Sequence, residues 1–526
     1  MSDASGRGIT VSELATMDQP VDVAPETTVA FVGRTLRGPL NNPVLVRNAG
    51  EFRRRFGDAG PQSTLGAAVH DFFAHGGSRL FIVRVANNAR GAMLCLPASG
   101  SALVLRALEP GSTETLRAAV DYDAVRADDE FNLTLQRLDR ATGFLLDQEY
   151  YARLSYREDS GRFVLDALLS SDMARVDRPL PTHRPEPTVG LEHGVGVEYV
   201  EAAQDGSDGE DLTDYDLVGS RADATGIFAL DRVDRVDVLY LPPMSDSRDP
   251  GPTAILAAER YCRERGALLV VDPRAAWTDA GEAVAGIREL GYSSPNMLGY
   301  FPRIRDGSHP DRPSRPAGAA IAGLLAKLDR HYGPWQSLDQ QGLALRRPYR
   351  PSCAVDAEDH RPLERSGFNV LVSDGTHRLR LRGDRTLARG RAPHRGQADL
   401  RVQRLCLGLI HAVDAATRWA VFEQPGPKLR ARVEAQVYSA FDILTEAGAF
   451  ADAGFTVKCN IEASVNAGPH AVELMLAFTP SGCHEPVSLS VHQTIAGCRV
   501  TSTAFAPVIR PARPGVIPAP AAPAVA

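Results

Sequence analysis

The common sequence motifs of enzyme active sites are missing from this chain. It contains no GxxxxGK(S/T) phosphate-binding loop, no HExxH zinc motif and no GxSxG nucleophile motif. A GxGxxG dinucleotide-binding loop after an apolar strand is missing as well. The commonest signatures of nucleotide use, zinc hydrolysis and acyl transfer are therefore missing, although their absence does not exclude an enzyme.

Three weaker candidates for chemistry remain. The acidic stretch Asp205–Asp211 resembles a calcium loop but lacks the alternating ligand spacing and the final bidentate Glu of an EF-hand, which favours a plain turn. Asp272 follows the apolar run Leu268–Val271, where α/β enzymes place catalytic groups, but Pro273 comes next and favours a turn or cap. Cys483, His484 and Glu485 are adjacent on the chain, so neighbouring side chains point to opposite faces, and a surface turn is favoured.

A cluster of arginines is the strongest charge feature. On a strand, Arg378, Arg380 and Arg382 fall on one face by the period of two, with leucines on the other, and Arg385 follows. A solvated outer face and a docking surface for an acidic partner are equally compatible with this pattern. Because no aromatic residues are interleaved, a nucleic-acid surface is disfavoured.

Composition indicates a folded protein of several domains. The 526 residues include 58 Lys and Arg against 65 Asp and Glu, a net charge of −7, and 44% are hydrophobic. Seven cysteines without a CxxC pair make a disulfide framework or a structural zinc site improbable. Neither a signal peptide nor a run of about 18 apolar residues is apparent, so we expect no membrane insertion.

Strand and helix patterns alternate in two separated stretches. The runs Val29–Gly33 and Arg79–Val85 enclose a helical stripe, and Leu268–Val271 follows a helix pattern over Pro252–Arg265. This rhythm predicts an α/β core with a parallel sheet, formed by residues 28–94 and 220–345. Residues 95–219, between them, show short alternating runs that predict an inserted, mostly β outer domain.

The last part of the chain predicts a separate α+β domain over residues 346–507. It contains two alternating runs, then two amphipathic helices, the second opening at Pro427, and then three β runs between Phe455 and Ile495. The Pro- and Ala-rich residues 508–526 predict a flexible tail. The expected fold class is therefore a multi-domain α/β and α+β chain.

Residues 1–27 predict an arm rather than a domain. Ile9, Val11, Glu13 and Leu14 belong to a short alternating piece that is separated from the first core strand by two prolines. Such an isolated strand is not stable in water and needs a partner to satisfy its backbone groups.

In order, these segments resemble the tail sheath family of contractile phage tails and of phage-tail-like contractile injection systems. The resemblance rests on the following stretches: Gly8–Glu13, Thr28–Thr35, Phe72–Gly77, Asp205–Gly209, Asp237–Pro243, Gly299–Pro302, Arg315–Gly323, Gly367–Val370 and Trp419–Glu423. No single stretch is decisive, but their order from residue 8 to about residue 495 is that of the family.

The resemblance implies a structural protein that is not an enzyme and has no catalytic residue, metal or cofactor. Its subunits would stack as hexameric rings around an inner tube and contract to drive the tube into a target envelope, with Ile9, Val11, Glu13 and Leu14 in strand exchange between subunits. It implies Arg378, Arg380, Arg382 and Arg385 as candidates for a tube-facing surface.

The implied partners are further copies of the chain, the inner tube, the baseplate and the tail terminator, without nucleic acid. Assembly would take place in the bacterial or host cytoplasm, and the product would be a phage tail or an injection particle. Two alternatives stay open from the residues: an α/β hydrolase-like enzyme, and a carbohydrate- or receptor-binding module in the inserted domain.

Overall fold

The computed structural model describes most of the chain as two compact units, one from Glu26 to Gln403 and one that contains the described residues from Arg404 onward. The described residues are 26–57, 64–188, 198–309, 311–339, 342–346, 348–374, 378–389, 398–423, 426–460, 472–483, 485–494 and 497–504. The predicted C-terminal tail and the predicted N-terminal arm, apart from Glu26 and Thr27, lie outside these ranges, so both stay predictions.

The first unit is built on an eight-stranded sheet, here called the main sheet. From one edge to the other its strands are β17 (Leu379–Arg382), β16 (Asn369–Ser373), β13 (Met297–Phe301), β12 (Leu268–Val271), β11 (Val238–Tyr240), β1 (Val29–Gly33), β3 (Leu80–Arg84) and β2 (Val44–Val46). All neighbouring pairs from β16 to β3 are parallel, and the two edge strands are antiparallel to their neighbours. The predicted parallel sheet is confirmed.

Helices cover both faces of the main sheet, as parallel strands require. One face packs against α1 (Ala49–Phe56), α2 (Thr64–Ala74) and α7 (Gly318–Tyr332). The other packs against α4 (Asp214–Val218), η2 (Gly226–Arg232), α5 (Pro252–Arg265), α6 (Ala280–Glu289) and α8 (Ala357–Ser366). A small antiparallel pair, β14 (Ile304–Asp306) and β15 (Tyr349–Pro351), lies outside the main sheet.

The helix predicted over Pro252–Arg265 is α5, with the same bounds. Pro252 occupies its first turn, where a missing backbone N–H costs nothing. Gly266 ends it with φ +68°, a left-handed conformation that glycine adopts without strain.

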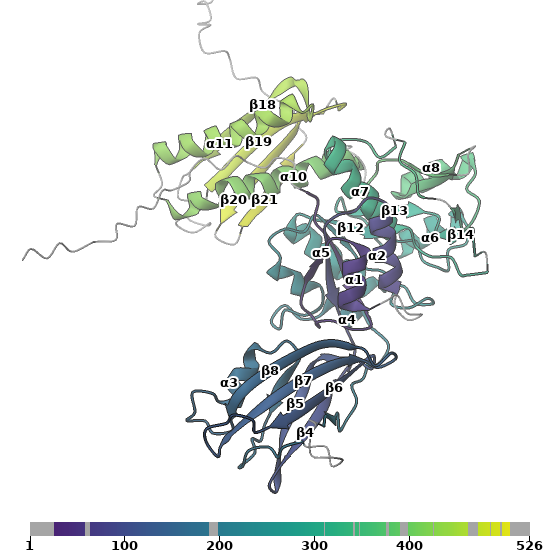
Figure 1. The fold of residues 1–526 in the computed structure, drawn as a ribbon. Helices are drawn as coiled ribbons and strands as arrows, with labels where there is room; N and C mark the ends of the chain where they lie inside the picture. Colours follow the sequence, from purple (N-terminus) through teal and green to yellow (C-terminus); the bar gives the residue numbers. More distant parts are fainter. Residues whose placement is uncertain are drawn as a thin grey trace, which may run out of the picture. The chain divides into compact units, whose positions relative to one another are not determined.

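Two further sheets form a β-domain, Gly91–Glu201. One contains β4 (Gly91–Ala98), β5 (Ser101–Pro110) and β9 (Ala174–Asp177), and the other contains β10 (Val200–Glu201), β6 (Glu114–Asp121), β7 (Glu130–Asp139) and β8 (Leu145–Ser155). They share one hydrophobic core, and the short α3 (Val164–Ala167) and η1 (Leu168–Ser170) add to it. Figure 1 shows its long strands β5, β6, β7 and β8 running together.

The structure moves two boundaries of the predicted domains. Leu212 and Leu217, expected in the insertion that ends at residue 219, are buried in the core of the main sheet. Residues 349–403, expected in the C-terminal domain that begins at residue 346, stay with the first unit, because β16 pairs with β13 and β17 extends the same sheet.

The second unit combines helices with a four-stranded antiparallel sheet (Figure 1). Its elements are α10 (Leu400–Thr417, which starts before the boundary), η3 (Arg418–Phe422), α11 (Pro427–Glu446), β18 (Phe450–Asn460), β19 (Val472–Pro480), β20 (Val487–Thr494) and β21 (Gly497–Ala504). Phe441 of α11 packs its ring against Phe450 and Phe455 of β18. The two helices and three of the strands match the predicted order, and β21 was not foreseen.

One helical stretch among the described residues, Leu400–Phe422, is long and apolar enough to span a membrane by length and composition alone. Of its 18-residue window, 56% is buried inside the protein, as in the core helix of a folded domain.

Candidate functional site

An α/β protein usually binds its ligand at the carboxyl ends of the parallel strands. The site lies between two neighbouring strands whose connections run to opposite sides of the sheet. In the main sheet this point lies between β1 and β11. After β1 the chain forms β2 and β3 on one side of β1, and it then crosses to form β11 and the following strands on the other side. Tyr240, Asp272 and Arg303 lie at the carboxyl ends of β11, β12 and β13.

Carboxylates of the chain itself occupy two helix N-termini at this edge. Asp272 accepts a hydrogen bond from Gly318 N of α7 (3.0 Å) and one from the Tyr240 hydroxyl (2.7 Å). Asp214 accepts from Gly251 N (2.8 Å) and Ala254 N (3.2 Å) at the start of α5. Free N–H groups at helix N-termini are the usual anion sites of α/β proteins, and here internal aspartates satisfy them.

Asp272 therefore has a capping role, as its sequence context favours, although the helix that it caps begins 46 residues later. Burial raises the pKa of the Asp272 carboxyl to about 7, against the opposing effects of the Tyr240 hydrogen bond and of Arg303. Arg303, only 4% exposed, is paired with Asp249 at 2.9 Å and donates to Pro273 O. These polar side chains are therefore paired with each other or with the backbone of the chain itself.

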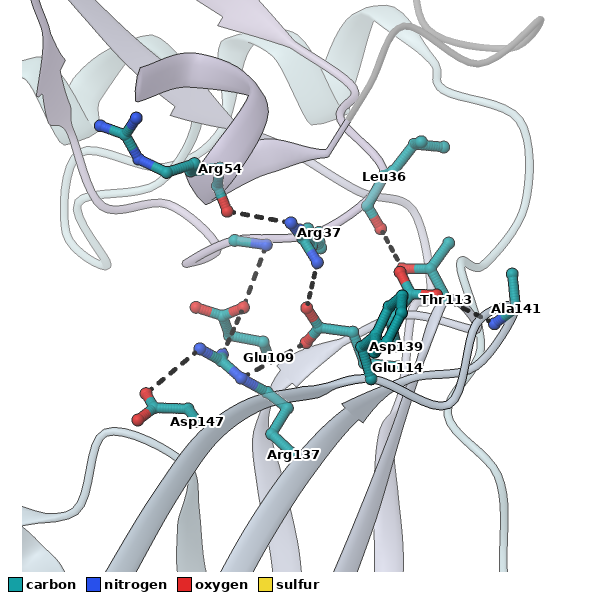
Figure 2. Close-up of polar contacts among 12 residues, drawn as sticks. Leu36, Arg37, Arg54, Glu109, Thr113, Glu114, Arg137, Asp139, Ala141 and Asp147 are labelled. Carbon is teal, nitrogen blue, oxygen red and sulfur yellow. Dashed lines mark hydrogen bonds and ion pairs between the residues drawn. The ribbon is translucent and has the colours of Figure 1, made fainter. Parts of the chain in front are cut away.

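A second polar cluster joins the core to the β-domain, and Figure 2 shows it. Arg137 of β7 lies between Glu109 at the end of β5 (3.3 Å) and Glu114 of β6 (3.7 Å). Each glutamate also reaches the core: Glu109 accepts from Gly38 N (3.0 Å), and Glu114 accepts from Arg37 (3.1 Å). We call these five residues, with Arg84, the junction.

Arg84 is the buried member of the junction. It ends β3, is 1% exposed, and donates to Gly38 O and to Pro110 O, both at 2.7 Å. One guanidinium thus ties a core loop to the end of a β-domain strand. Burial lowers the pKa of Arg84, and Glu109 is the largest of the charges that oppose this shift.

The acidic stretch Asp205–Asp211 is the return connection of the β-domain to the core. Asp208 accepts from Ser112 N (3.1 Å), and Arg34 donates to the carbonyl oxygens of Asp208 and Glu210. Gly209 has φ +76°, and a Cβ there would lie 1.9 Å from the carbonyl oxygen of Asn87. The stretch is not the plain turn that the sequence predicts: it runs antiparallel to the outgoing chain, with Ser207 bridged to Arg90 and Glu210 bridged to Asn87.

Among the residues that the structure describes, no group of three or more His, Cys, Asp or Glu side chains is arranged to hold a metal ion.

The predicted alternation on β17 is confirmed. Arg378, Arg380 and Arg382 are exposed, while Leu379 and Leu381 are buried. Arg380 is paired with Asp374 at 2.8 Å.

Of the other predicted site residues, Arg385 is among the residues that the structure describes, and most of the rest are not. Arg385 is exposed beyond the end of β17. Ile9, Val11, Glu13 and Leu14 lie outside the described residues. So does His484, which leaves the Cys483–His484–Glu485 candidate without a described geometry.

Sequence reasoning missed the junction. Its residues come from four separate strands and a loop, and its contacts join positions 23 to 77 residues apart. Arg84, a charged residue within the otherwise apolar run Leu80–Val85, was the one local signal.

Comparison with known proteins identifies the fold, although no protein-family model matches the chain and no curated protein matches its sequence. A sheath tail protein from Listeria innocua superposes with a TM-score of 0.59 at 11% identity, covering 89% of this chain and 94% of the other. A sheath tail protein from Desulfitobacterium hafniense gives 0.52 at 14% identity, with 93% and 99% covered. The contracted sheath complex of PVC, an extracellular contractile injection system, gives 0.51 at 13%, with 91% and 95% covered.

The chain therefore has the mixed α/β fold of the sheath proteins of phage tails and contractile injection systems. At the level of the fold, this confirms the resemblance seen in the sequence.

We predict that Glu114→Gln weakens the junction. The Arg37 and Glu114 side chains are only 16% and 14% exposed, so removing the charge leaves two shielded arginines short of a partner. Urea denaturation should show a loss of roughly 1–3 kcal/mol. As a matched control, Asp159→Asn removes the exposed pair with Arg157 and should change nothing measurable. Equal effects of the two substitutions would contradict this role of the junction.

We predict that Asp272→Asn becomes stabilising as pH rises. The pKa of Asp272 is higher in the folded chain, about 7, than in the unfolded chain, so the wild type loses stability as pH increases from about 4 to 7. Asn copies the protonated carboxyl and does not titrate. Urea denaturation at pH 5 and at pH 8 measures this. From pH 5 to pH 8, the free energy of unfolding of the variant should rise by roughly 2–4 kcal/mol relative to that of the wild type. A relative stability independent of pH would contradict the prediction.

Proposed function

We propose that this chain is a structural sheath subunit that polymerises as hexameric rings around an inner tube and contracts to drive the tube into a target envelope. The observation that carries the proposal is the extent of the fold match, which covers 89–93% of this chain and 94–99% of three sheath proteins. One of the three belongs to a contracted sheath complex, which supports contraction as the working step.

The carboxyl edge of the main sheet supports a structural role over an enzymatic one. A hydrolase-like unit would keep the polar groups at this edge available for substrate. Here Asp272 and Asp214 cap helices, and Arg303 is paired with Asp249.

The junction supports a subunit body that moves as one piece. Four arginine contacts run between the core and the β-domain or its return connection, and the most buried guanidinium, that of Arg84, contacts both sides. On this proposal, contraction changes the contacts between subunits and leaves the junction unchanged.

We propose that the N-terminal arm joins neighbouring subunits by strand addition. Ile9, Val11, Glu13 and Leu14 would pair with an edge of the four-stranded sheet of another subunit, whose described edge strands are β18 and β21. An added strand satisfies backbone hydrogen bonds at both chains while a flexible stem lets the bodies rotate.

Assembly of the purified chain tests the proposed function directly. Electron microscopy of the wild type should show rings or helical tubes. Replacing Ile9 and Val11 by proline removes two backbone donors, so we predict soluble, folded protomers that no longer form tubes. Sedimentation velocity measures how far the variant has lost the ability to form tubes. Ile9→Thr with Val11→Thr is the matched control, because threonine keeps strand propensity and both N–H groups.

Two results would count against these proposals. A chain starting at Val21 that still forms normal tubes would show that the arm is not the linking strand. A wild type that stays monomeric, alone and with tube protein, would contradict the sheath function itself.

We further propose that Arg378, Arg380, Arg382 and Arg385 face an acidic inner tube. Replacing Arg378, Arg380 and Arg382 by glutamate should weaken tube-dependent assembly, most strongly at low salt, with little loss of stability, because the three side chains are exposed. Co-sedimentation with the tube protein at 50 and 300 mM salt measures this. The control replaces two exposed arginines of α1, Arg54 and Arg55, by glutamate. Unchanged tube binding by the triple variant would contradict the placement.

The remaining partners follow from the same proposal. A sheath subunit at either end of the particle would contact baseplate and tail-terminator proteins, and assembly would take place in the cytoplasm of the producing cell.

A further inference from the structure

A short segment, Leu343–Arg346, covers the β17 edge of the main sheet. Leu345 N donates to Leu379 O (2.8 Å), and Leu381 N donates to Leu343 O (3.1 Å). Leu345 is 2% exposed. We call Leu343–Arg346 the cover segment, because it satisfies backbone groups that an open edge strand would offer to another chain.

The last residue of the cover segment is held by a buried histidine. Arg346 N donates to Nε2 of His75 at 3.0 Å. His75 follows α2, is 4% exposed, and lies with Nδ1 at 2.7 Å from Asp71 O. A carbonyl oxygen can only accept, so Nδ1 carries the proton and Nε2 has a free lone pair for Arg346. The ring is therefore neutral.

The surroundings of His75 oppose a positive charge. Burial lowers the pKa of His75, and Arg346 and Arg315 lower it further, against the opposing effect of Asp71. Asp71 is itself paired with Arg315 (2.7 Å) and accepts from the Tyr349 hydroxyl (2.6 Å). The charged or titratable groups that lie close to His75 or to the neighbouring Gly76 are Asp71 on α2, Arg315 before α7, Lys327 and Arg330 on α7, Arg346 on the cover segment and Tyr349 on β15.

We propose that neutral His75 is a latch that holds the cover segment on β17, and that its protonation in acid releases the segment and opens this edge of the main sheet. A proton on Nε2 removes the acceptor for Arg346 N and places a donor against a donor. In the open form the imidazole titrates near its ordinary pKa of about 6.5, so opening at pH 5.5 is favoured up to about tenfold relative to pH 7.5.

Hydrogen exchange of the full chain tests the latch. After correction for the intrinsic exchange rate, protection of the Leu345 and Leu381 amides should fall up to about tenfold between pH 7.5 and 5.5 in the wild type. In His75→Gln it should not change with pH, because the glutamine oxygen can accept from Arg346 N and does not titrate. In His331→Gln, which removes an exposed histidine at the end of α7, the fall should be that of the wild type.

Either of two results would overturn the proposal. One is protection that is independent of pH in the wild type, and the other is an equal fall in His75→Gln. If that variant does not fold, the ring of His75 can be titrated by NMR in the wild-type chain. A pKa below 6.5 with a lone pair on Nε2 supports the latch, and a pKa at or above 6.5 overturns it.

Discussion

Parallel pairing in the main sheet is the constraint on which the first unit depends. Parallel strands cannot be joined by tight turns, so each return crosses a face of the sheet and places helices on both sides. The same rule gathers the carboxyl ends of β1, β3, β11, β12 and β13 at one edge. In many α/β proteins that edge binds a ligand. Here its helix ends are capped by aspartates of the chain itself.

The β-domain leaves from this same edge, after β3, and the junction contacts the chain on both sides of that exit. Arg84 ends β3 and binds both the core loop at Gly38 and the β-domain at Pro110. Breaking one such contact leaves a charged group buried without a partner. The loss of stability is then larger than the net contribution of the contact itself. Such a connection would suit the proposed sheath subunit, because a soft link between the core and the β-domain would absorb the movement of contraction.

The sequence predicted elements whose signals are local and missed those that depend on distant pairing. The apolar run at Val29 and the Pro252 and Gly266 signals of α5 mark their elements without help from the rest of the chain. No local feature shows that β16 pairs with β13, so β16 and β17 were placed in the wrong domain. The predicted alternation on β17 is correct, but the sheet to which β17 belongs was not predicted. Period-two patterning indicates which face of a strand is buried, and it does not indicate which strand is the neighbour. The junction stayed hidden because its charges are scattered along the chain.

On the proposed sheath function, the body from Glu26 to Gln403 stays rigid while contacts between subunits change. Cryo-electron microscopy of the assembled chain before and after contraction tests it most directly. We expect the main sheet and the β-domain to superpose as one body in the two states, with the contacts of Arg37, Arg84 and Arg137 intact. A β-domain that swings against the main sheet, with those contacts broken, would contradict it.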